Sequence, residues 1–395
     1  GFAEEIFPFL ERAIEGALEN YVDAQGFLTH TDPDTWMDAK IAGKEPWSPR
    51  GNRAVDIQVL WYTALDTALG LAERQGIRKP RWEEVKKALA ENFLKEFWSD
   101  KRGILADRLT SSGEADWTIR PNALMALTIP LEDPILDEEK ARSLVKKTVE
   151  TLLFPYGIVS LDPDDDNFHP RHENLPWYHK DAAYHNGTIW GWNAGFTISA
   201  LVKLGALDRA SELTRELNRQ ILDLGCRGSM SENMDALTDE AGNVVLTGTY
   251  SQAWSVSEFT RNWSQDYLGY VPDLLKDRVS LSPRLPGDVG MAEAVFPLGA
   301  GSFHCEIRQN RDSWTLVVGP PPRELTLAVS IPVQGGYREK EIIWRDSIEI
   351  RFSKKDLPSR KQAPFNPSFA VEPKGRSWPS IEQKNYLIDK ILGRH

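Results

Sequence analysis

Apolar residues recur at every third or fourth position through most of the chain, which is typical of amphipathic helices. In residues 53–75, for example, Ile57, Trp61 and Leu65 follow one another at intervals of four. The pattern predicts about eight helices, at residues 2–22, 53–75, 81–98, 137–152 and, more weakly, 121–128, 188–203, 207–223 and 251–266. Long polar loops lie between them, at residues 23–52, 99–119, 153–187 and 224–250.

The period changes to two after Pro286, as in Phe303, Cys305 and Ile307, and this predicts half-buried antiparallel strands. Helices with long loops followed by a small β unit indicate a mainly α protein, an α/α barrel whose loops build a pocket. The expected domains are residues 1–286 for the helical part, 287–355 for the β domain, and 356–395 for a C-terminal tail with a short helix at 382–392.

Composition narrows the function classes. The net charge of −11 disfavours binding to nucleic acids and to anionic membranes. Neither a membrane-spanning apolar run nor a signal-peptide pattern at Gly1 is present, so we expect a cytoplasmic protein. Cys226 and Cys305 do not have the spacing of metal ligands, and phosphate-binding motifs are absent from the sequence. The acidic residues 162–166 lack the glycine and the terminal glutamate of a calcium-binding loop. We therefore expect no metal and no cofactor. The 14 tryptophans favour sugars as ligands, because aromatic faces stack on sugar C–H groups.

Two loop carboxylates are candidates for acid–base chemistry. Asp38 lies beside Trp36, and an apolar neighbour favours a protonated acid. Glu232 follows a turn rich in glycine and serine that would project it from a rigid bend. Taken alone, each is better explained as a turn or surface carboxylate.

Polar residues also gather at two helix starts. Tyr184, His185 and Asn186 precede Trp190, a set that can stack on a sugar ring and bind its hydroxyls, or can be structural. Arg120 stands directly before Pro121, where it could clamp a carboxylate or a pair of hydroxyls.

Taken in order, these segments resemble the amylo-α-1,6-glucosidase domain of glycogen debranching enzymes. The resemblance is spread over residues 27–286 and rests on short strings in the same order, at residues 35–40, 49–50, 55–62, 119–122, 155–158, 184–190, 229–232, 252–256 and 282–286.

The resemblance implies an (α/α)6 barrel and hydrolysis of α-glucosidic bonds with inversion. It implies that Asp38 is the general acid and Glu232 the general base, on opposite faces of the sugar and roughly 6.5–9.5 Å apart. It also implies an oligosaccharide or α-glucoside substrate. The expected sugar contacts are Trp36, Asp56, Gln58, Arg120, Asn122, Tyr184, His185, Asn186, Trp190, Gln252 and Trp254.

The chain departs from the family pattern at three places. Asp56 stands where the family has Glu, the segment 236–249 is long enough for a lid, and about eight helices are too few for a closed barrel of six helix pairs. The family's upstream Trp-Gly-Arg-Asp segment is also absent. We therefore expect an upstream segment or a second chain to complete the barrel, and an uncovered apolar seam that includes residues 53–75.

The sequence leaves two kinds of alternative function open, another glycosidase activity and a protein without enzymatic activity. A related α-glucosidase or a trehalase- or mannosidase-like exo-enzyme fits the same fold, because loops set the sugar specificity. A catalytically silent carbohydrate-binding protein is the alternative outside enzymes. For the hydrolase, we expect at least two of Trp36, Trp190 and Trp254 to line the pocket and to exclude water around Asp38.

Overall fold

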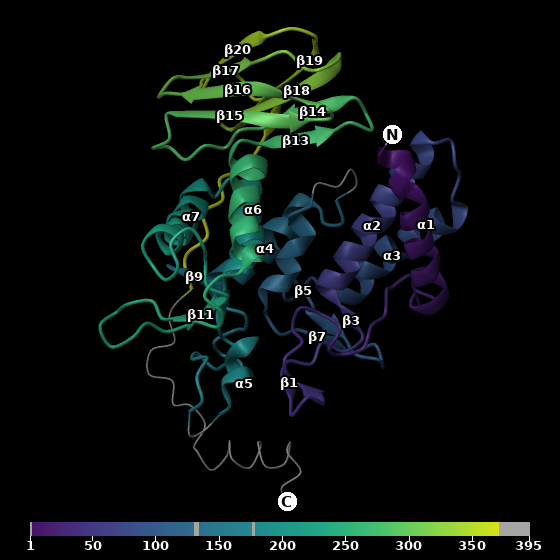
Figure 1. The fold of residues 1–395 in the computed structure, drawn as a ribbon, viewed down its shortest axis with the longest axis vertical. Coiled ribbons are helices and arrows are strands. Elements are labelled where there is room, and N and C mark those ends of the chain that lie inside the picture. The colour runs from purple at the N-terminus through teal and green to yellow at the C-terminus, as the bar shows by residue number, and fades with distance from the viewer. Residues whose placement is uncertain (1, 130–133, 176–177, 371–395) are drawn as a thin grey trace, which may run out of the picture. The chain divides into compact units, whose positions relative to one another are not determined.

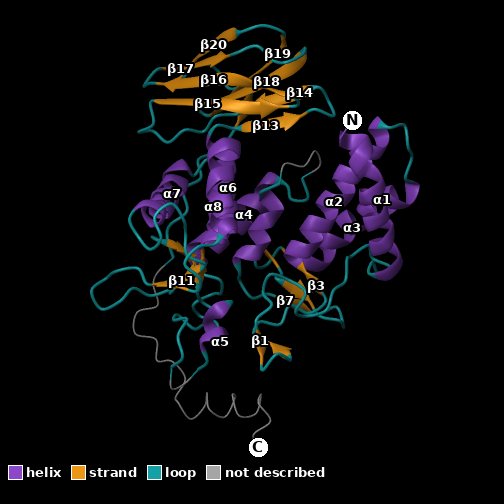
Figure 2. Ribbon diagram, viewed as in Figure 1, coloured by secondary structure: helices purple, strands orange, loops and turns teal. Residues whose placement is uncertain are grey.

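The computed structural model describes residues 2–129, 134–175 and 178–370. Its helices are drawn in Figures 1 and 2. The described residues form eight α-helices, which are α1 (Phe2–Asn20), α2 (Val55–Arg74), α3 (Pro80–Phe97), α4 (Glu138–Leu152), α5 (Lys180–Tyr184), α6 (Gly191–Leu204), α7 (Leu207–Leu222) and α8 (Ala253–Arg261). A 3-10 helix covers Pro121–Leu127, and a π-helix, Asn262–Tyr267, continues α8. All eight predicted helical segments are confirmed. The pattern missed α5, because five residues are too short to show a period.

The expected (α/α)6 barrel is not confirmed. The described residues contain too few helices for a closed ring of six pairs, and much of the chain forms sheets instead. The expectation of a mainly α protein is therefore corrected to a chain of helices and several antiparallel sheets. Many strands have only two residues, and an alternating pattern cannot be recognised over so short a distance. None of the described helices is both long enough and apolar enough to cross a bilayer.

The chain divides into two compact units, each described by itself below. The first comprises Gly1–Thr197, Arg215–Val256 and Pro367–His395, and the second Ile198–Thr214 and Ser257–Asn366. The predicted terminal helix at 382–392 lies outside the described residues.

In the first unit α2 packs against both α1 and α3, which lie beside it in Figure 1. Nine residues of α2 are buried, so the prediction that residues 53–75 would be uncovered is wrong, because α1 and α3 cover this helix. Exposed apolar side chains are concentrated on α1 instead, at Phe2, Ile6 and Phe9.

Short strands of the first unit hold its loops together. The two-residue strands are β1 (Lys40–Ile41), β2 (Glu45–Pro46), β3 (Arg53–Ala54), β4 (Trp98–Ser99), β5 (Ile104–Leu105), β6 (Arg108–Leu109), β7 (Ala115–Asp116), β8 (Leu153–Phe154), β9 (Gly157–Ile158), β10 (Ile189–Trp190), β11 (Asn233–Met234) and β12 (Leu246–Thr247). The sheet β10-β11-β12 matters most for the site, because β11 begins directly after Glu232 and β10 ends directly before α6.

The second unit is built on two sheets in the orders β13-β14-β18-β19-β21 and β15-β16-β17-β20. Their strands are β13 (Tyr270–Asp273), β14 (Arg278–Leu281), β15 (Met291–Leu298), β16 (Gly301–Gln309), β17 (Ser313–Val318), β18 (Leu325–Val333), β19 (Gly336–Trp344), β20 (Ile348–Ser353) and β21 (Arg360–Lys361). Pairing is antiparallel except between β14 and β18, which are parallel. Two strands, β13 and β14, lie before residue 287, where the sequence pattern placed the start of the β domain.

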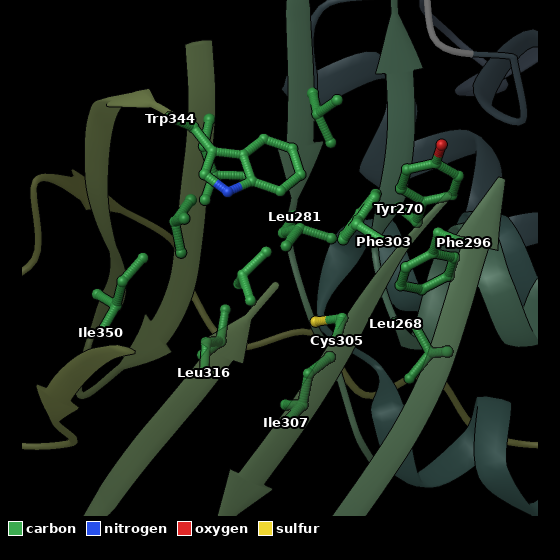
Figure 3. Close-up of a cluster of buried hydrophobic side chains, with 14 of the residues drawn as sticks. Leu268, Tyr270, Leu281, Phe296, Phe303, Cys305, Ile307, Leu316, Trp344 and Ile350 are labelled. Carbon is green, nitrogen blue, oxygen red and sulfur yellow. The ribbon is translucent and has the colours of Figure 1, made fainter. Parts of the chain in front are cut away.

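The core of the second unit lies between these sheets, as Figure 3 shows. Phe303, Cys305 and Ile307 of β16 are buried, which confirms the predicted alternation of this strand. Trp344 packs edge-on against Phe303 with ring centroids 4.8 Å apart. The unit therefore has a hydrophobic core of its own.

Candidate active site

Glu232 is held by three hydrogen-bond donors from separate segments of the first unit. Its Oε1 accepts from the Tyr184 hydroxyl at 2.5 Å and from the Gln252 side-chain amide at 2.9 Å. Its Oε2 accepts from the backbone N–H of Thr249 at 3.0 Å. All three groups donate, so the arrangement is complementary to an ionised carboxylate. The side chain keeps a contact with solvent, since the residue is 9% exposed.

A glycine allows the two strands beside Glu232 to approach closely. Gly248 follows β12 with φ +72°, a left-handed conformation that glycine adopts at no steric cost. A Cβ at this position would lie 2.5 Å from Oε2 of Glu232 and 2.6 Å from Oδ1 of Asn233. Only glycine therefore fits at position 248 beside the Glu232 carboxylate. No sequence motif pointed to this requirement.

Tyr184 links the two predicted catalytic carboxylates. Burial, its hydrogen bond to Glu232 and the negative charges of Glu232 and Asp38 all raise the pKa of Tyr184 far above its ordinary value. The phenol is therefore a neutral donor at any physiological pH. Asp38 therefore lies within electrostatic range of the hydroxyl that binds Glu232.

The surroundings of Asp38 differ from the expectation. Asp38 is exposed, whereas its neighbours Met37 and Trp36 are buried and partly buried. The expectation that indoles exclude water around Asp38 is therefore wrong for this structure. The reason is local: Trp36 turns toward other aromatic rings, and the chain carries Asp38, two residues later, to the surface.

The three predicted tryptophans meet in one aromatic cluster. Trp36 contacts His185, Trp190 and Trp192 edge-on, at centroid distances of 5.2, 5.4 and 4.9 Å. Trp254 stacks on Trp192 at 4.9 Å and meets Trp190 edge-on at 5.6 Å. Trp190 is only 2% exposed and fills the interior, whereas Trp254 is 36% exposed. Trp36 and Trp254 thus remain the indoles that can face a ligand.

A buried ion network supports this cluster. The guanidinium of Arg50 pairs with Asp56 at 2.7 Å and with Asp107 at 2.9 Å, and all three side chains are buried. Burial alone would lower the pKa of Arg50, but the two carboxylates outweigh it and raise that pKa. Asn122 donates to Asp107 at 2.9 Å and accepts from Nε1 of Trp36 at 2.9 Å. The network therefore fixes the orientation of Trp36.

Arg120 and Asn186 join two further loops. Arg120 donates to the carbonyl of His185 and to Oδ1 of Asn186, both at 2.7 Å, and lies 3.8 Å from Asp107. Burial lowers the pKa of Arg120 to about 10 despite the opposing charge of Asp107. Arg120 acts here as a link between segments of the protein rather than as a clamp for a carboxylate.

Several expected sugar contacts face protein instead. Gln58 exchanges hydrogen bonds with the backbone of Leu28, at 2.9 Å in both directions, and is fully buried, as are Asn122 and His185. A side chain without solvent contact cannot touch a sugar in this conformation. Asp56, Asn186 and Trp190 are also buried, which leaves Trp36, Arg120, Tyr184, Gln252 and Trp254 as expected contacts that are at least partly exposed.

His172 and Asp235 belong to the neighbourhood although no sequence motif pointed to them. The His172 ring packs on Tyr184 at 4.9 Å, and its Nδ1 lies 3.1 Å from the Thr247 hydroxyl. Burial and the positive charge of Lys180 lower the pKa of His172. Asp235 accepts from the backbone N–H of His172 at 2.8 Å, and burial raises the pKa of Asp235 to about 6.

Among the described residues, no group of three or more His, Cys, Asp or Glu side chains is placed to hold a metal ion. In the acidic loop, the carboxylates of Asp162 and Asp165 accept from backbone N–H groups two residues further on, at 2.9 and 2.8 Å. Such short-range bonds are those of ordinary turns.

Comparison with solved structures shows a shared fold. A sialidase superposes with a TM-score of 0.55 at 13% identity, over 80% of this chain and 28% of that one. An α-L-rhamnosidase from Dictyoglumus thermophilum superposes with a TM-score of 0.53 at 11% identity, over 89% of this chain and 37% of that one. The Streptomyces avermitilis α-L-rhamnosidase superposes with a TM-score of 0.53 at 13% identity, over 89% of this chain and 31% of that one.

Comparison of sequences identifies the family. The glycogen debranching enzyme of Saccharomyces cerevisiae (strain ATCC 204508 / S288c) is 26% identical over 296 residues, which cover 60% of this chain and 19% of that protein. The chain thus spans about a fifth of the length of this curated relative. The family described as amylo-alpha-1,6-glucosidase matches residues 2–261, a region that contains Asp38, Glu232 and the three hydrogen-bond donors of Glu232. With about two thirds of its residues inside that match, the chain belongs to the amylo-alpha-1,6-glucosidase family.

Proposed function

We propose that the protein is an inverting glycoside hydrolase that releases glucose from α-linked glucosides, with a terminal α-1,6-linked glucose as its substrate. Asp38 is the general acid and Glu232 the general base. The observation that supports this assignment most is the triple hydrogen bonding of Glu232 by Tyr184, Gln252 and Thr249. A carboxylate fixed from both oxygens is suited to orient one water molecule.

The division of roles follows from the surroundings of each carboxyl group. Glu232 accepts hydrogen bonds only, so it is prepared to take a proton from water as that water attacks the anomeric carbon. Asp38 is exposed, so a sugar can approach it directly. As the general acid, Asp38 gives its proton to the leaving oxygen.

The same site has groups that can hold a glucose ring. Trp36 and Trp254 are at least partly exposed indoles, and Gln252 lies next to Glu232. In such sites apolar faces supply most of the contact, and a few polar groups fix the orientation. An uncharged sugar fits this combination.

Turnover of defined glucosides tests the proposal. The chain is assayed on branched limit dextrin, isomaltose, panose, maltose and trehalose, with NMR detection of the first anomer released. We expect glucose as the β anomer from an α-1,6-linked substrate. Release of the α anomer would contradict inversion, and a preference for trehalose would indicate the trehalase-like alternative.

Two variants test the residue assignment. Asp38→Asn and Glu232→Gln should each lower kcat by at least about 100-fold while the protein stays folded. Glu240→Gln is the matched control, because Glu240 is exposed in the same hairpin and carries the same change. Near-normal turnover by either catalytic variant would refute its role. Binding of oligosaccharides without any turnover by the unsubstituted chain would indicate a carbohydrate-binding protein.

A further inference from the structure

We propose that Tyr250 is a specificity-determining residue that contacts the leaving part of the substrate, the sugars beyond the terminal glucose. This inference rests on the proposed function, because it takes Glu232 as the position of the cleaved glucose. Tyr250 is not among the residues expected from the sequence, and it has no role in holding Glu232.

The backbone on both sides of Tyr250 is fixed to the segment that carries Glu232. The N–H of Glu232 donates to the Thr249 carbonyl at 3.0 Å, and the Thr249 N–H donates back to Oε2 of Glu232. Two residues further on, the backbone N–H of Gln252 donates to the Met230 carbonyl at 2.9 Å. Tyr250 therefore stands at a defined position, between two residues that both bind the carboxylate.

The side chain of Tyr250, by contrast, projects into solvent. It is 87% exposed, more than any other large apolar side chain in the described residues. A single exposed aromatic residue is ordinary on a protein surface. Here a second exposed ring, Trp254, follows four residues later and is itself fixed by stacking on Trp192. Two exposed rings thus come from the one segment that holds Glu232.

The chemistry of an exposed tyrosine selects one part of the substrate. A tyrosine offers a large rigid face and a hydroxyl at little cost in side-chain entropy, and no charge is required for either contact. Neutral sugars present matching C–H faces and hydroxyls. An enzyme that removes a terminal glucose has every other sugar of the substrate on the leaving side. A ring as open to solvent as Tyr250 therefore suits that outer chain rather than the terminal glucose placed at Glu232.

Two substrates separate the outer chain from the terminal glucose. Branched limit dextrin carries leaving sugars, whereas the leaving group of α-D-glucosyl fluoride is a single fluoride ion. Tyr250→Ala should lower kcat/KM for the dextrin about three- to tenfold, the effect of losing one aromatic contact, and should leave the fluoride unchanged. Tyr250→Phe should keep most of the activity on both substrates. Tyr21→Ala, at an exposed tyrosine directly after α1, is the matched control and should change neither.

The outcomes are distinct. An equal loss of kcat/KM on both substrates would show that Tyr250 supports the Glu232 segment. No loss on either substrate would show that Tyr250 makes no contact with the substrate. Either result overturns the inference but leaves the proposed hydrolase function standing. Cleavage of the fluoride but not of the dextrin by the unsubstituted chain also overturns it. If the unsubstituted chain cleaves neither substrate, the proposed function itself has failed and the inference falls with it.

Discussion

Replacing Gly248 by alanine tests how strictly the fold positions Glu232. The new Cβ would lie 2.5 Å from Oε2 of Glu232, inside the 3.0 Å that carbon atoms keep from their neighbours, so the oxygen has to retreat by about 0.5 Å. That oxygen is held by the Thr249 N–H at 3.0 Å, and the retreat stretches or breaks this bond. Because a displacement of about 1 Å can cost about 100-fold in rate, we expect kcat to fall about tenfold.

Alanine at a positive φ has a cost of its own, about 1–2 kcal/mol, that has nothing to do with the carboxylate. Gly242→Ala measures this cost separately, because Gly242 has φ +83° and no atom within 4 Å of the position of a Cβ. Both variants should lose stability in thermal unfolding, and Gly248→Ala should lose more, because its Cβ also clashes with Glu232 and Asn233. Only Gly248→Ala should lose turnover of isomaltose or limit dextrin. Equal activity of the two variants would refute the argument that this glycine positions Glu232.

Two further predictions concern stability. Arg50→Met leaves Asp56 buried without its cation and leaves Asp107 with only the more distant Arg120, so it should lower the free energy of unfolding by about 3–5 kcal/mol. Arg323→Met, which breaks an exposed pair with Asp277, should cost about 1 kcal/mol or less, and urea denaturation compares the two variants. Burial raises the pKa of Asp235 to about 6, above the value of about 3.9 in an unfolded chain, so its contribution to stability is complete below about pH 4 and is lost as the pH rises through about 6. In melting curves from pH 4 to 7, Asp235→Asn should remove this part of the pH dependence, and an unchanged dependence would contradict it.

The sequence allowed the helices to be predicted because each repeats a local pattern. In α2, burial of Trp61 and Leu65 requires only that apolar residues recur with the period of the helix. The same holds for Phe303 and Cys305 in β16. The two-residue strands of the first unit have no such pattern, and some pairs, such as β3 with β6 and β10 with β11, join loops that lie far apart along the chain.

The site was predictable only where side chains belong to a recognisable string. Asp38 and Glu232 lie in such strings, but their different exposure depends on contacts that the strings do not contain. Asp107, which completes the ion network with Arg50, lies 57 residues away from it in a loop without any motif. Gln58 was expected to bind sugar because it lies in one of the strings that resemble the family, and the sequence does not show that its partner is the backbone of Leu28.

The hairpin between β11 and β12 separates Glu232 from the tip of its own loop. Pairing of Asn233 with Thr247 and of Met234 with Leu246 closes its base. A further bond from the Asp235 N–H to the Val245 carbonyl, at 3.0 Å, extends this closure, and residues 239–243 beyond it are exposed. Changes in length at the tip therefore stop at the closed base and do not reach Glu232. This makes the tip a place where loops of other lengths can be grafted to alter substrate range while the chemistry is kept.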